Sequence, residues 1–124
     1  MGAKGMTAVA VALAIGVIAW AGRDDAALDR PLSAAQAALL ASVEPGEVLM
    51  YCSESCPECE HARRWLDRHQ VSYTACHVET DRTCEAEAQA LGVEATPYFV
   101  LRHTAQPRRL VGWDPAEFMA ALAD

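Results

Sequence analysis

Two cysteines separated by two residues stand where an apolar run gives way to a helical pattern. The motif Cys56-Pro57-Glu58-Cys59 follows the apolar run 48–52 and opens a stretch with apolar residues every three or four positions. A continuous apolar run of this length is typical of a strand covered on both faces. Proline suits the first turn of a helix, where the backbone N–H has no partner to lose. The motif therefore marks a junction between a buried strand and a helix, which indicates an α/β chain.

The position of the motif suggests what each thiol does. A thiol at a helix N-terminus faces unpaired backbone N–H groups and the positive end of the helix dipole, and both favour the thiolate. Cys56 is therefore the candidate nucleophile, and Cys59, one turn deeper on the same helical face, is the candidate resolving thiol. Glu54, Glu58 and Glu60 surround the motif. We expect their charges to raise the pKa of the Cys56 thiol and to disfavour an anionic substrate.

The rest of the chain predicts a small sheet with helices around it. Ser33 and Gln36 form a capping-box pattern, and Asp81, Gly92 and Asp114 mark further helix ends. The predicted order after the first short helix is strand, helix, strand, helix, strand, strand, helix. Helices are expected over 34–43 and 57–69, from 81 to 92 and from 114 onward, and strands over 48–52, 71–78, 98–101 and 109–111.

The three other cysteines have less specific patterns. Five cysteines is an odd number, so a fully paired disulfide scaffold cannot use them all. Cys52 ends the apolar run and is interpreted as a small core residue, with a third redox thiol as the alternative. Cys76 and Cys84 are either bonded to each other, which an exported domain permits, or both packed in the core.

A metal centre is the main alternative use of the paired thiols. His61 lies two positions beyond Cys59 and would point to another helical face, and no second close pair completes a zinc or copper site. We therefore expect no metal ligand here. An iron–sulfur cluster shared between two copies through Cys56 is a further alternative.

Residues 6–22 carry no charge and would span about 25 Å as a helix, the short end for a bilayer. We predict a single-pass membrane anchor at residues 1–22, a linker and short helix at 23–46, and one compact domain at 47–124. A cleaved signal ending near Ala19-Trp20-Ala21 and a buried soluble helix are the alternatives. The predicted location of the domain is periplasmic or otherwise extracytoplasmic, with a cytoplasmic orientation left open because the flanking basic residues nearly balance.

Charge excludes one class of partner. Acidic side chains outnumber basic ones by 17 to 10, which gives a formal net charge of −7. Such a chain repels phosphate, and it has no stripe of Lys and Arg, so nucleic acid is not an expected partner. A hydrophobic share of 52% is too high for a disordered protein and allows one modest core.

Two further segments accompany the cysteine pair, Thr96-Pro97 before one predicted strand and Gly112-Trp113-Asp114-Pro115 after another. Together with the cysteine motif they resemble the thioredoxin superfamily, and within it the glutaredoxins and the glutaredoxin-like electron donors of ribonucleotide reductase. The resemblance covers residues 47–124. It implies a thioredoxin-like (glutaredoxin-like) four-stranded mixed sheet flanked by helices, to which the chain adds its N-terminal hydrophobic helix. In such a sheet the first two strands are parallel and the last two are an antiparallel pair.

The resemblance also implies a substrate groove. Pro97 is expected in the cis form beside the active disulfide, and Thr96, Trp113 and Asp114 are expected to help bind the substrate, with the backbone before Pro97 pairing with it like an added strand. Ser53 stands where many glutaredoxins carry a Lys that holds a glutathione carboxylate. Glutathione is therefore retained only as a candidate co-substrate.

The resulting expectation is a thiol–disulfide oxidoreductase that uses a Cys56/Cys59 couple on protein disulfides or glutathione-mixed disulfides and needs no cofactor. Its partners would be a disulfide-bearing protein and a reductant or oxidant, and residues 6–22 would attach it to a membrane. A metal-binding or cluster-binding module on the same thiols and a redox-silent binding domain are the alternatives.

Overall fold

A computed structural model describes residues 30–124, and Leu32–Asp124 form one compact unit. The predicted membrane or signal segment 6–22 and the first part of the predicted linker lie outside the described residues. Among the helices that the structure describes, none is long and apolar enough to cross a membrane. The helices are α3 (Ala34–Ala41), α4 (Pro57–Arg68), α5 (Arg82–Leu91) and α6 (Pro115–Ala123), and the strands are β1 (Val48–Cys52), β2 (Thr74–His77), β3 (Tyr98–Leu101) and β4 (Arg108–Val111).

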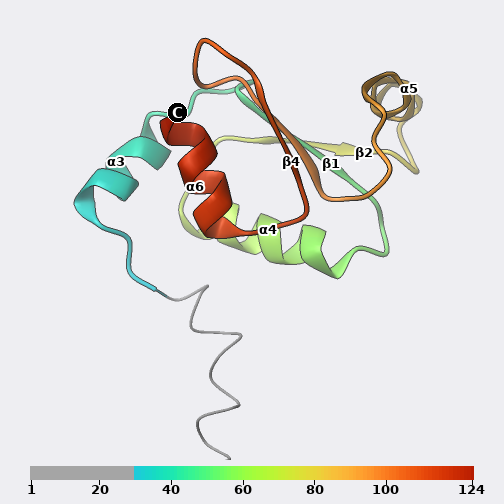
Figure 1. Ribbon diagram of the computed structural model, residues 1–124. Helices are drawn as coiled ribbons and strands as arrows, with labels where there is room; N and C mark the ends of the chain where they lie inside the picture. Colours follow the sequence, from blue (N-terminus) through green and yellow to red (C-terminus); the bar gives the residue numbers. More distant parts are fainter. Residues whose placement is uncertain (1–29) are drawn as a thin grey trace, which may run out of the picture. The chain divides into compact units, whose positions relative to one another are not determined.

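The four strands form one mixed sheet in the order β2-β1-β3-β4 (Figure 1). Strand β1 pairs with β2 in parallel and with β3 in antiparallel fashion, and β3 pairs with β4 in antiparallel fashion. Tyr51 lies in the middle of this register, opposite Cys76 on one side and Tyr98 on the other. The four-stranded mixed sheet expected from the sequence is confirmed. The central strand β1 ends at the cysteine motif, so the sheet fixes the position of the candidate site.

Successive residues of β1 and β3 point to opposite faces of the sheet, as strand geometry requires. On one face Phe99 packs against Phe118 of α6, with ring centroids 5.7 Å apart, and Trp65 of α4 lies 6.0 Å from the same ring. On the other face Tyr51 and Tyr98 pack with residues of β2 and α5. Figure 1 shows α5 well separated from α4 and α6. Both faces of the central strands are therefore covered, which explains why residues 48–52 are a continuous apolar run.

The helix ends follow the predicted capping chemistry. The Ser33 hydroxyl accepts the N–H of Gln36 at 3.1 Å, and the Gln36 side chain accepts the N–H of Ser33 at 3.0 Å, which completes the capping box. Asp81 caps α5 through the N–H groups of the two residues after Arg82. Gly92 ends the same helix with φ at +72°, a left-handed conformation that glycine adopts without a steric penalty.

One strand is shorter than predicted. The sequence indicated a strand over 71–78, whereas β2 covers Thr74–His77. The first paired position of β1 with β2 is Leu49 opposite Thr74, so residues 71–73 lie before the pairing begins. The N–H of Val71 instead donates to the Leu66 carbonyl at 2.9 Å and closes the end of α4. The apolar pattern at 71–78 thus combines a helix-end contact with a strand.

The short helix α3 packs against α6, and its residue Leu40 is buried. At the end of α3 the Ser42 hydroxyl lies 3.2 Å from Nε2 of His103, whose Nδ1 contacts the Glu47 carboxylate. These contacts attach α3 to the ends of β1 and β3. The division of the chain at residues 22 and 46 stays a prediction.

The structure resolves the alternative left open for two cysteines. Cys76 of β2 and Cys84 of α5 form a disulfide, with Cα atoms 5.4 Å apart. Both residues are 8% exposed and pack in the same cluster as Tyr51 and Tyr98. The bond therefore fastens α5 to the edge strand of the sheet on the face opposite α4.

Removing this disulfide should lower the free energy of unfolding. The cross-link spans a sequence separation of 8, and the chain-entropy model gives about 2.5 kcal/mol for a loop of this size. We expect the double variant Cys76→Ala/Cys84→Ala to lose roughly this amount in urea denaturation followed by circular dichroism. Dithiothreitol should destabilise the parent protein by a similar amount and leave the double variant unchanged. A parent protein whose stability does not respond to the reductant would contradict the prediction.

Candidate active site

Cys56 is the N-cap of α4, at the position where the sequence predicted the nucleophile. Its backbone is extended (φ −124°, ψ 98°), and its Sγ accepts the backbone N–H of Cys59 at 3.2 Å. The Cys56 S–H donates to the carbonyl of Thr96 at 3.4 Å. The thiol thus replaces the hydroxyl or carboxylate that usually caps a helix, and it faces the positive end of the helix dipole.

The pKa of the Cys56 thiol is lowered from its ordinary value, although a neighbouring carboxylate acts to raise it. Burial acts to raise this pKa, but it is outweighed by hydrogen bonds from the Cys59 side chain, the Thr96 side chain and the Cys59 backbone N–H. The charge of Glu58 raises it, as a smaller effect. The sign expected for the carboxylates holds for Glu58, but hydrogen bonds at contact distance stabilise the thiolate more than this exposed carboxylate destabilises it.

Cys59 has the opposite character. Its side chain is 1% exposed, and burial together with the hydrogen bond to Cys56 raises the pKa of its thiol. A reagent from solution therefore meets Cys56 first, and of the two thiols Cys56 loses its proton more readily. This difference suits a nucleophile and a resolving thiol one helical turn apart.

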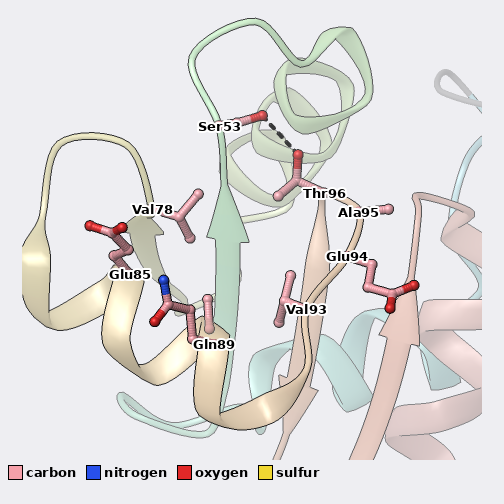
Figure 2. A pocket seen from close by; sticks show the side chains of 9 residues that line it. Ser53, Val78, Glu85, Gln89, Val93, Glu94, Ala95 and Thr96 are labelled. Atoms are coloured by element: carbon pink, nitrogen blue, oxygen red, sulfur yellow. Dashed lines mark hydrogen bonds between the residues drawn. The ribbon is translucent and has the colours of Figure 1, made fainter.

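The segment before β3 closes the site from the other side. The peptide bond between Thr96 and Pro97 is cis, as the resemblance implied. The Thr96 hydroxyl lies 2.8 Å from the Ser53 hydroxyl (Figure 2), and the Pro97 carbonyl accepts the N–H of Gly112 at 2.8 Å. Three loops that are distant in sequence therefore meet around Cys56.

Trp113 and Asp114, also predicted to bind the substrate, have contacts within the protein. The Trp113 ring packs against Trp65 and Phe118, with centroids 5.4 and 5.5 Å away. The Asp114 carboxylate caps α6 by accepting the N–H groups of Ala116 at 2.9 Å and Glu117 at 3.4 Å. Both residues position the loop that follows β4, and their contact with a substrate stays a prediction.

Cys52 lies at the end of β1 and is 1% exposed. Its S–H donates to the carbonyl of Met50 at 3.6 Å. Burial, followed by the interaction with Cys59, raises the pKa of this thiol to about 12. These features favour the packing role over a third redox thiol, because the thiolate is the reactive form.

Sequence reasoning missed two contributors to the site. Ser53 was noted as a departure from the glutaredoxin pattern, but its bond to Thr96 required the fold. Glu58 was treated as one of three similar carboxylates, but it differs from the other two because it borders the loop after β4. Its Oε2 lies 3.6 Å from the position that a Cβ atom on Gly112 would occupy.

In the described part of the chain, no group of three or more His, Cys, Asp or Glu side chains is arranged to hold a metal ion.

Comparisons with known proteins agree with this geometry. Residues 48–102 match the family model of the glutaredoxins. A mutant of the thioredoxin-like protein BC3987 superposes with a TM-score of 0.55 at 18% identity, over 63% of this chain and 96% of that one. A glutaredoxin from Archaeoglobus fulgidus superposes with a TM-score of 0.51 at 18% identity, over 63% of this chain and 87% of that one. No curated protein matches the chain. The compact unit therefore has a thioredoxin-like fold, and residues 48–102 are glutaredoxin-like.

The order of the thiol pKa values predicts selective labelling. When the three free thiols are fully reduced, one equivalent of iodoacetamide at neutral pH should label Cys56. The reason is that the thiol pKa of Cys56 is lowered, whereas those of Cys52 and Cys59 are raised. Peptide mapping by mass spectrometry identifies the labelled residue. The pH at which labelling reaches half its maximal rate should rise in Thr96→Val, since that variant loses a hydrogen bond to the thiolate. Thr80→Val, changed at an exposed turn, serves as the control and should leave the pH profile in place. Preferential labelling of Cys59 would contradict the assignment.

Proposed function

We propose that this protein is a thiol–disulfide oxidoreductase that acts on protein disulfides through the Cys56/Cys59 couple. The observation that carries the proposal is the arrangement of the two thiols at the start of α4. Cys56 is partly exposed with a lowered thiol pKa, and Cys59 is buried beneath it with a raised one. The glutaredoxin match over residues 48–102 supports a thiol-based redox function.

The first step is attack by the Cys56 thiolate on one sulfur of the substrate disulfide. A bond forms between Cys56 and that sulfur, and the other substrate sulfur leaves as a thiolate that takes a proton from solvent. The backbone around Thr96 lies beside the reacting sulfur and offers peptide groups to an extended substrate.

Cys59 then loses its proton and attacks the Cys56 sulfur of this mixed disulfide. The second substrate sulfur leaves as a thiolate and is protonated, so that the substrate gains two electrons and the protein holds a Cys56–Cys59 disulfide. The buried position of Cys59 one turn away makes this attack intramolecular, which favours it over attack by a thiol from solution. A reducing partner restores the dithiol, and with an oxidising partner the same steps run in reverse.

We also propose that the domain works outside the cytoplasm, attached to a membrane through residues 6–22. The Cys76–Cys84 disulfide supports this location because such bonds persist mainly in oxidising compartments. A topology reporter fused after Asp124 tests it. Reporter activity on the outer side of the membrane is expected, and activity confined to the cytoplasm would overturn the proposed location.

Substitution of the resolving thiol should trap the substrate. We expect Cys59→Ser to form a mixed disulfide with a protein substrate and to lose multiple turnover, because nothing resolves the bond to Cys56. Non-reducing electrophoresis and mass spectrometry detect the trapped complex, and reductant should release it. Cys56→Ser should trap nothing and lose disulfide reduction entirely.

Cys52→Ala is the matched control for this experiment. Because Cys52 is buried and has a strongly raised thiol pKa, its removal should leave disulfide reduction within about twofold of the parent rate. Equal activity of Cys56→Ser and the parent protein would refute the proposed function.

A further inference from the structure

A cavity of about 390 Å³ lies between α5 and the segment before β3 (Figure 2). Ser53 and Thr96 line it, and their hydroxyls are hydrogen bonded to each other. The carbonyl of Thr96 also accepts the hydrogen bond from the Cys56 S–H. Thr96 therefore lines the cavity and contacts the candidate nucleophile. A volume of this size lies within the range of about 300–1,000 Å³ typical of ligand sites. A group attached near a substrate cysteine can therefore reach the cavity while that cysteine meets Cys56.

The inner wall of the cavity is apolar. It includes Val78, which follows β2, Ala88 of α5 and Val93, which follows α5. Ala88 is 6% exposed, and the two valines pack against the cluster that contains the Cys76–Cys84 disulfide. This wall offers a surface for a hydrocarbon chain, whose burial removes apolar area from water.

The outer part of the cavity is acidic. Glu85 and Glu94 both line it and are both exposed, and they come from opposite sides, one from α5 and the other from the segment before β3 (Figure 2). No Lys, Arg or His is among the described residues that line the cavity. Arg82 begins α5 one turn before Glu85 but does not line it. The combination is an apolar wall with carboxylates at the solvent edge.

We propose that this cavity is a subsite for a basic side chain, Lys or Arg, close to the reactive cysteine of a polypeptide substrate. The hydrocarbon stem of such a side chain would lie on Val78, Ala88 and Val93. Its cation would reach the solvent edge, which Glu85 and Glu94 border from opposite sides (Figure 2). Long basic side chains bind in this divided manner, with the stem buried and the charge in water. The inference rests on the proposed function, and it names the substrate class of that site.

The same carboxylates work against anionic substrates. A substrate with a carboxylate beside its cysteine, such as an acidic peptide or a glutathione-mixed disulfide, would bring like charges together at the edge of the cavity. Repulsion of the wrong partner is an ordinary source of specificity. Each exposed charge pair is weak, so the two together support a discrimination of about tenfold.

The test compares three short peptide disulfides that differ only at the two residues flanking the cysteine, which are Lys, Gln or Glu. The reduced full chain is assayed at low salt, and kcat/KM is measured for each peptide. We expect the order Lys, Gln, Glu, with about tenfold between the extremes, and a smaller spread at high salt because ions screen exposed charges.

The double variant Glu85→Gln/Glu94→Gln should lower the ratio of kcat/KM between the Lys and Glu peptides while it still reduces all three peptides. Glu44→Gln/Glu117→Gln is the matched control, because it removes the same charge from exposed positions elsewhere and should keep the preference. An unchanged ratio in the first double variant, or a preference for the Glu peptide, would overturn the subsite. Equal turnover of the three peptides would overturn the subsite and leave the proposed function standing, whereas no turnover of any peptide would overturn both.

Discussion

The hydrogen bond from the Cys59 backbone N–H to the Cys56 sulfur is the contact on which the site depends. It places a sulfur at the N-cap of α4, where other helices of this fold use an oxygen. That position lowers the pKa of one thiol and places the second one turn below it in the buried side of the helix. The helix can begin there because β1, covered on both faces, ends four residues earlier at Cys52. Packing of the central strand is thus the physical basis for the reactivity of the thiol.

The acidic character of the chain acts at two different ranges. Close to Cys56, hydrogen bonds outweigh the charge of Glu58, and the thiolate is favoured despite the carboxylates around it. Elsewhere, Glu85 and Glu94 border the cavity lined by Ser53 and Thr96. Contact interactions therefore govern the nucleophile, whereas the exposed charges are available to select its partner.

The disulfide between Cys76 and Cys84 belongs to the other face of the sheet. It fastens α5 to β2, and the same helix supplies one wall of the cavity beside Thr96. The chain thus separates two uses of cysteine chemistry. A closed pair fastens the helix that forms one wall of the cavity, and the two thiols at the start of α4 are free.

Local sequence patterns were sufficient for the element order, the caps at Ser33, Asp81 and Asp114, and the position of the Cys56/Cys59 pair at the start of a helix, because each depends on residues a few positions apart. The extent of β2, the bonding of Cys76 to Cys84 and the lowered thiol pKa of Cys56 depended on tertiary structure. Each of these is decided by strand register or by contacts between distant segments, such as Thr96 with Cys56. Spacing along the chain carries no information about such contacts, so the cavity lined by Ser53 and Thr96 too became visible only in the folded protein.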